Sequence, residues 1–248
     1  DDMYAFLREV TDSNSEPIIA YMNARKEVLE LKTAVKTQVF AEEKPTPTGE
    51  REALLASMAA KGDFSKLEAE ALADAAKKAL TEASASRDPQ TVDLILDRAL
   101  YEYRRDIAGT SGIEYLSTVC KNDADIKNLC TAFRLKRRKA LPENAENFFY
   151  DGGAISVPDL MLFVKEPEKA KKALSATEYG TLALELADKK ASPSECEKAL
   201  EEKYYAGLMK VKDDIFGSGK VVAYAILYEK WLCDLRLLLT AKKVGKTI

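Results

Sequence analysis

The sequence predicts an all-α protein made of three similar helical units. Apolar residues recur at the three- and four-residue spacing of amphipathic helices along most of the chain, and no stretch shows the alternation typical of a β-strand. One charged helical phrase also occurs three times, which indicates internal repetition. We expect the units to span residues 1–42, 51–140 and 151–248 and to form a funnel, with the first unit incomplete.

Four helices are predicted in the first half of the chain, at residues 16–40, 51–60, 64–83 and 89–105. The polar, proline-containing stretch 42–50 separates the first of them from two segments rich in alanine and leucine, which are strong helix formers. The last of the four is the clearest, because Val92, Leu96 and Tyr103 fall on one helical face. Asp88 is its predicted N-cap, with Pro89 in the first helical position.

The second half continues with helices predicted at residues 113–139, 156–165, 176–190, 193–215 and 220–243. Asp151-Gly152-Gly153 interrupts the helical pattern, and Gly217-Ser218-Gly219 separates the last two helices. Ser192-Pro193-Ser194-Glu195 has the form of a capping box with proline at the first helical position. These stop and start signals support a chain of separate helices.

The repeated phrase consists of a base, three residues, an acid, an aliphatic residue and a second base. Its charged members are Lys26, Glu30 and Lys32 in the first copy, Lys121, Asp125 and Lys127 in the second, and Lys230, Asp234 and Arg236 in the third. A lysine four residues before an acid stabilises a helix by only a few tenths of a kcal/mol. The recurrence of so weak a pair favours contacts with a neighbouring unit or a partner, and a solvated helix face is the alternative.

Composition excludes several classes of function. The chain has no histidine, which rules out Ser-His-Asp and Cys-His catalysis and histidine-ligated zinc or haem. The 38 basic and 41 acidic residues leave a formal charge of −3, which argues against bare nucleic acid as the main partner. No spacing of residues predicts a catalytic, cofactor or metal site.

The cysteines and the most apolar stretch of the chain both suggest structural roles. Cys120, Cys130, Cys196 and Cys233 contain no CxxC pair, and we interpret them as small core residues. The stretch 221–239 contains four charged residues, so no membrane-spanning segment is expected. We expect Trp231, within this stretch, to pack in the core, with insertion into a groove of a partner as the alternative.

A basic run near the middle of the chain contains Arg134, Arg137 and Arg138. Its simplest interpretation is a solvated helix end, where cations complement the helix dipole. Acidic loops of a partner or lipid head groups remain alternatives. Nucleic acid is disfavoured because the run lacks aromatic residues that could stack on bases.

Several stretches resemble the C subunit of the V-type (archaeal and bacterial) ATP synthase, which is equivalent to the d subunit of the eukaryotic vacuolar ATPase. The resemblance covers most of residues 85–248 and, more weakly, residues 16–40. The stretches that carry it begin at Asp88 (DPQTVDLILDRALYEY), Asp125 (DIKNLCTAFRLK), Asp151 (DGGAI), Leu174 (LSATEYG) and Tyr228 (YEKWLCDLRLLLTAKKVG).

The resemblance implies a non-catalytic protein without a cofactor. Members of that family form a funnel of helical units on the cytoplasmic side of the membrane proteolipid ring, and the funnel receives a shaft made of the D and F subunits. It passes torque between proton or sodium flow and ATP turnover. The alternatives are a helical-repeat adaptor that binds another protein, and an all-helical enzyme that uses acids or lysines.

Overall fold

The computed structural model describes residues 5, 8–9, 15–212 and 217–245. Over these residues the chain forms ten α-helices and one short 3-10 helix, and no strand is present among them. The predicted all-α fold class is therefore confirmed. The chain divides into a first compact unit, Ile19–Thr110, and a second compact unit, Asp1–Ile18 with Ser111–Ile248. The arrangement of three units as a funnel stays a prediction, as do their boundaries at 1–42, 51–140 and 151–248.

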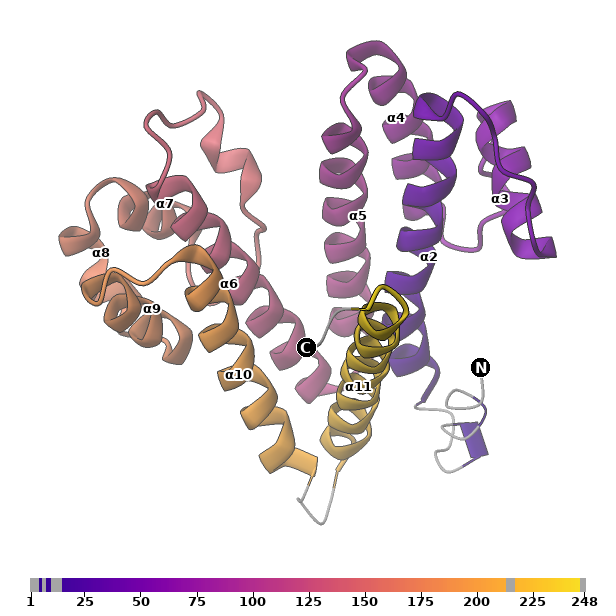
Figure 1. The fold of residues 1–248 in the computed structure, drawn as a ribbon. Coiled ribbons are helices and arrows are strands. Elements are labelled where there is room, and N and C mark those ends of the chain that lie inside the picture. The colour runs from indigo at the N-terminus through magenta and orange to yellow at the C-terminus, as the bar shows by residue number, and fades with distance from the viewer. Residues whose placement is uncertain (1–4, 6–7, 10–14, 213–216, 246–248) are drawn as a thin grey trace. The chain divides into compact units, whose positions relative to one another are not determined.

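The first compact unit contains four helices (Figure 1), and buried apolar residues from all four form one core. They are α2 (Ser15–Phe40, which enters the unit at Ile19), α3 (Glu50–Lys61), α4 (Glu70–Ser86) and α5 (Pro89–Thr110). Val28, Leu31 and Val35 of α2 point into this core together with Leu72 of α4 and Leu96 of α5. The small side chains of α4 allow its backbone to lie close to α5, and its buried alanines are Ala76, Ala79 and Ala83.

The start of α4 differs from the prediction. Residues 64–69 were expected to be helical, but α4 begins only at Glu70. The carboxylate of Asp63 accepts a hydrogen bond from the Ser65 N–H at 3.0 Å, and this local turn competes with helix formation. Gly62 ends α3 in the left-handed conformation, with φ of 67°, which glycine adopts without steric cost.

The second compact unit is organised around α6 (Glu114–Lys136) (Figure 1). The elements after it are η1 (Ala145–Phe148), α7 (Val157–Lys165), α8 (Pro167–Leu174), α9 (Glu178–Asp188), α10 (Pro193–Lys212) and α11 (Gly219–Lys243). Helices α7, α9, α10 and α11 all contact α6. Leu129 and Phe133 of α6 are buried with Phe163 of α7, and the two rings meet edge to face at 5.5 Å.

Helix boundaries in this unit follow the predicted signals with one exception. The capping box is confirmed, because the Ser192 N–H donates to Glu195 Oε2 at 2.6 Å and the Glu195 N–H donates to Ser192 Oγ at 3.2 Å. In the first unit, Asp88 similarly accepts from the Gln90 N–H at 2.9 Å and caps α5. Helix α8 was not predicted. Pro167 cannot continue α7 but suits the first position of a new helix.

The cysteines fit the core interpretation at three of four positions. Cys120, Cys130 and Cys196 are buried, and burial raises the pKa of Cys130 to about 12, which makes its thiol unreactive. Cys233 is exposed on α11, so the prediction is wrong for this residue.

Candidate interaction surfaces

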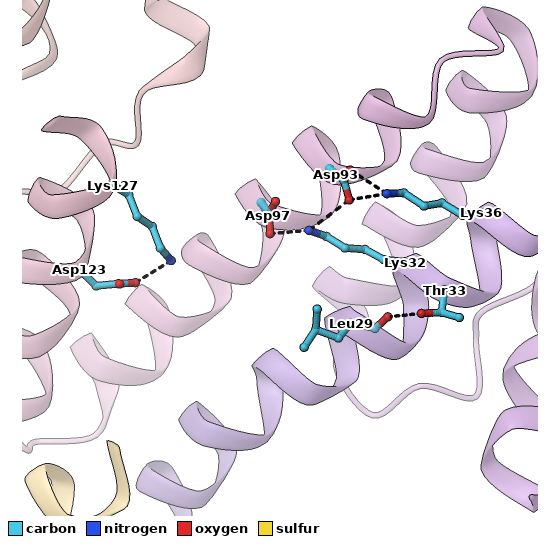
Figure 2. A network of polar contacts seen from close by, with 8 residues as sticks. All are labelled: Leu29, Lys32, Thr33, Lys36, Asp93, Asp97, Asp123 and Lys127. Atoms are coloured by element: carbon cyan, nitrogen blue, oxygen red, sulfur yellow. Dashed lines mark hydrogen bonds and ion pairs between the residues drawn. The ribbon is translucent and has the colours of Figure 1, made fainter. Parts of the chain in front are cut away.

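The first copy of the charged phrase forms contacts within the first compact unit. Lys32 of α2 extends to α5, where its Nζ lies 2.7 Å from Asp97 and 3.4 Å from Asp93. Lys36, one turn further along α2, lies 2.7 Å from Asp93 (Figure 2). The Lys32 side chain is only 14% exposed, so these ion pairs are better shielded from water than most surface pairs. Together they connect α2 to α5.

The acid of this copy is bound by an arginine of another helix. Glu30 accepts a hydrogen bond from Arg51 Nε of α3 at 3.3 Å, and the same guanidinium donates to Glu27 at 2.9 Å. Lys26 lies on the exposed side of α2. The phrase therefore anchors α2 to α3 and α5 in this unit.

The acid of the second copy has a different role. Asp125 is 1% exposed, and its carboxylate accepts hydrogen bonds from the Ala154 N–H at 3.1 Å and the Ile155 N–H at 3.0 Å. Asn128, one turn later, donates to the Tyr150 carbonyl and accepts from the Tyr150 N–H, both at 2.8 Å. These two side chains hold residues 150–155 against α6.

The close approach of this loop depends on Gly153. A Cβ at this position would overlap with Asp125 Oδ1, so only glycine fits without a shift of the loop. Burial raises the pKa of Asp125, and the two N–H donors only partly oppose this effect. Lys121 is exposed, and Lys127 lies 2.8 Å from Asp123 on the same helix (Figure 2).

The third copy contains the predicted local pair. Lys230 contacts Asp234 one turn along α11, and the side chains are 36% and 50% exposed. Lys230 Nζ also lies 5.4 Å from the centre of the Tyr205 ring on α10. Arg236 is exposed. In this copy the acid pairs with the lysine of its own phrase.

The basic run lies at the C-terminal end of α6. Arg134 pairs with Glu197 of α10 at 2.8 Å, whereas Arg137 and Arg138 are exposed at and beyond the helix end. Lys136 lies 4.2 Å above the Phe163 ring, and burial lowers its pKa. This placement agrees with a solvated helix end and leaves two arginines accessible to a partner.

Sequence reasoning missed several residues that carry these contacts. Lys36, Asp93 and Asp97 complete the ion-pair cluster in the first unit, and Asn128 completes the loop anchor in the second. A usable signal existed, since the two lysines and the two aspartates are each four residues apart and so lie on single helix faces.

The described residues give little support for a reaction site. They contain no group of three or more histidine, cysteine, aspartate or glutamate residues that could hold a metal ion. A groove of about 580 Å³ lies beside α2 and α3, but two carboxylates that line it are already engaged, Glu30 by Arg51 and Glu52 by the N–H and hydroxyl of Thr48 at 2.8 Å. No described helix is long and apolar enough to cross a bilayer.

Trp231 is not where it was expected. Its side chain is 56% exposed on α11, so the predicted place in the core is wrong. Its ring contacts that of Tyr228 in a tilted arrangement, with ring centres 5.8 Å apart and an interplanar angle of 43°. The alternative that the sequence left open, contact with a partner, remains.

The chain matches one family model along almost its entire length. The model is described as ATP synthase (C/AC39) subunit, and the match covers residues 2–246. Neither the curated proteins nor the solved structures contain a match to this chain.

Proposed function

The chain belongs to the family of ATP synthase (C/AC39) subunits, and from this membership we propose that it is a central-stalk subunit of a V-type ATPase that couples the rotating shaft to the membrane proteolipid ring. The family match over residues 2–246 is the observation that carries the proposal. The proposed role is mechanical and non-catalytic: the protein transmits torque while protons or sodium ions cross the membrane elsewhere in the complex.

Rigid helical packing supports this role. A body that transmits torque must resist deformation, and close-packed helices with buried polar ties do so better than flexible connections. In the first compact unit, Lys32 links α2 to α5 through two aspartates. In the second, Asp125 and Asn128 fix the 150–155 loop to α6.

The proposed partners are the D and F subunits of the shaft and the proteolipid ring, with the protein placed peripherally on the cytoplasmic face of the membrane. Exposed basic residues such as Arg137, Arg138 and Arg236 are candidates for contacts with acidic loops of these partners. Nucleic acid is not a proposed partner, given the near balance of charge.

Direct assembly tests the proposal. The purified chain is mixed with the purified D–F shaft complex and, separately, with the detergent-solubilised proteolipid ring, and complexes are detected by sedimentation velocity. We expect a defined complex with each partner and no ATP hydrolysis by the chain alone. Binding to neither partner, or ATP hydrolysis that copurifies with the chain and persists through further purification, would contradict the proposal.

A pull-down from the native cells separates this function from the alternative of a helical-repeat adaptor. Recovery of the ATPase subunits supports the central-stalk role. Recovery of other proteins without any ATPase subunit supports the adaptor.

A further inference from the structure

Five exposed basic residues follow the ends of α6 and α9 in the second compact unit. We call them the basic surface: Arg137, Arg138, Lys139, Lys189 and Lys190. None of the five forms an ion pair with another residue of the ranges that the structure describes. Unpaired cations that share a surface create a positive potential, which attracts anions.

The end of α6 lies against the start of α10. Arg134 Nη2 donates to Glu197 Oε2 at 2.8 Å. The hydrogen bonds of Ser192 lower the pKa of Glu195, and the charge of Arg137 lowers it further, which places Arg137 close to that carboxyl. The bases that follow α6 therefore begin beside the first turn of α10.

The end of α9 reaches the same place. Only residues 189–192 separate α9 from α10, so Lys189 and Lys190 lie within a short reach of the start of α10. Burial lowers the pKa of Lys136, the last residue of α6, and the charge of Asp188, the last residue of α9, opposes this effect. The two helix ends are thus close neighbours, and the bases that follow them share one surface.

A closing turn fixes the backbone of the two lysines after α9. The N–H groups of Lys190 and Ala191 donate to carbonyls of α9, both at 3.0 Å, in a pattern that commonly ends helices. Lys190 occupies the left-handed position of this turn, with φ of 55°, where glycine or asparagine is the usual residue. A lysine here adds a charge to the surface at a cost in backbone conformation.

Acids near the basic surface reduce its charge without cancelling it. Glu197 is paired with Arg134, and Glu195 is bound in the cap with Ser192. The exposed acids of the flanking segments 140–148 and 185–188 are fewer than the bases, and they are Glu143, Glu146, Glu185 and Asp188. The whole chain has a formal charge of −3, but salt at about 0.1 M screens charges beyond about 10 Å, so the nearby bases dominate locally.

The composition of the basic surface favours lipid head groups over an acidic protein segment. Protein interfaces normally contain a core of aromatic or large apolar side chains. Among the described residues 134–142 and 185–195, no large apolar side chain is exposed, and Leu135 within the basic run is only 4% exposed. Clusters of about four to eight lysines and arginines bind anionic lipids through charge alone, and the arginine fork matches a phosphate group.

We propose that the basic surface binds the anionic head groups of a lipid membrane. Arg137 and Arg138 bind lipid phosphates through their guanidinium groups, and the three lysines add attraction to the negatively charged membrane surface. The proposal rests on the central-stalk function only in that this function places the chain beside a membrane.

Cosedimentation of the full chain with lipid vesicles tests the proposal. Vesicles of phosphatidylcholine alone are compared with vesicles that also contain phosphatidylserine. We expect saturable binding to the phosphatidylserine vesicles, binding to phosphatidylcholine that is weaker by about tenfold or more, and loss of binding at about 0.5 M salt.

Two sets of substitutions test whether the bases act together. The first is Arg137→Gln, Arg138→Gln and Lys139→Gln combined, which removes the charges after α6. The second is Lys189→Gln with Lys190→Gln, which removes those after α9. Each base near an anionic membrane contributes about fivefold in affinity, so each set should weaken binding to the phosphatidylserine vesicles by about tenfold or more.

A matched control removes three charges from the first compact unit. Lys61→Gln, Lys66→Gln and Lys77→Gln combined changes exposed residues outside the basic surface and should weaken vesicle binding by less than about twofold. Because all the substituted residues are exposed, thermal unfolding followed by circular dichroism should be unchanged in every variant.

Other outcomes would overturn the proposal. Equal binding to both kinds of vesicle, or an equal loss in the control variant, would exclude a specific surface for anionic lipid. Tight binding of a polyglutamate peptide that displaces the vesicles would identify an acidic protein segment instead, and displacement by inorganic phosphate would identify a free anion. If the chain binds the shaft complex and the ring but no anionic vesicle, only this proposal fails; if it binds the vesicles but neither the shaft nor the ring, only the central-stalk function fails.

Discussion

Replacing Asp125 by alanine should lower the free energy of unfolding of the second compact unit by about 2–4 kcal/mol. The buried Ile155 N–H would lose its acceptor at 3.0 Å, and an orphaned buried donor costs about 1–3 kcal/mol. Ala154 is exposed, so its N–H can turn to water and the loss of its 3.1 Å bond costs about 1 kcal/mol. The sum of these two losses gives the expected range.

Urea titration followed by circular dichroism and by Trp231 fluorescence measures this change, since the tryptophan lies in the second unit. The control is Asp123→Ala, two residues earlier on α6, which removes only an exposed pair with Lys127 worth less than about 1 kcal/mol. The reasoning is refuted if Asp125→Ala destabilises the protein no more than Asp123→Ala does.

The same carboxyl also predicts a pH dependence. Burial raises the pKa of Asp125 in the folded protein above that of the unfolded chain, about 3.9. Between the two pKa values the folded state binds more protons, so the stability falls as the pH rises through this window. Relative to Asp125→Asn, which does not titrate here, the wild type should therefore gain stability on acidification toward pH 4; the opposite trend would contradict the assigned direction.

Three further substitutions test other contacts by urea unfolding. Gly153→Ala should lower the free energy of unfolding by about 1–3 kcal/mol, because the new methyl group would overlap Asp125. This loss should be smaller in the Asp125→Ala background. The control is Gly207→Ala on α10, where the new methyl group meets open space and should be neutral or stabilising. Lys32→Ala should lower the free energy of unfolding by about 1–2 kcal/mol, because its ion pairs with α5 are partly shielded from water. Lys78→Ala removes a well-exposed pair with Glu82 and should lower it less. Equal losses would show that the link between α2 and α5 stabilises the fold no more than an exposed pair does. Ser192→Ala should lower the free energy of unfolding by about 1 kcal/mol at pH 7, because the helix cap is lost. The hydrogen bonds of Ser192 lower the pKa of Glu195, so this loss should diminish as the pH falls through that lowered pKa. A loss that does not change with pH would contradict the reciprocal cap.

The sequence predicted those features of the fold that depend on neighbouring residues. The extents of α2 and α11 and the start of α5 agree with the predicted helices, whereas α5 continues to Thr110, beyond its predicted end at residue 105. The start of α10 follows from the reciprocal bonds of Ser192 and Glu195. Two of the differences from the predicted helices have equally local causes. Asp63 forms a turn that delays α4, and Pro167 starts a helix too short to show periodicity.

The interaction residues were harder to predict because their surroundings come from distant parts of the chain. Nothing adjacent to Lys32 in the sequence reveals that Asp93 and Asp97 lie opposite it on α5. Likewise, the burial of Asp125 depends on a loop that lies well beyond its own helix in the sequence, and Trp231 is exposed because no described element covers it. Periodicity predicts which residues share a face, but it cannot predict what that face meets.

The three copies of the charged phrase show how such a face responds to its surroundings. A lysine–acid pair worth a few tenths of a kcal/mol cannot compete with an acceptor role toward buried N–H groups or with an arginine of another helix. Accordingly, Asp125 binds the 150–155 loop and Glu30 binds Arg51. The local pair between Lys230 and Asp234 forms on α11. In the two copies whose acid contacts another segment, the aliphatic residue after the acid is buried, as Leu31 and Ile126 show. On α11, where the acid contacts its own lysine, Leu235 is 38% exposed, so the partner of the acid and the burial of the next residue change together.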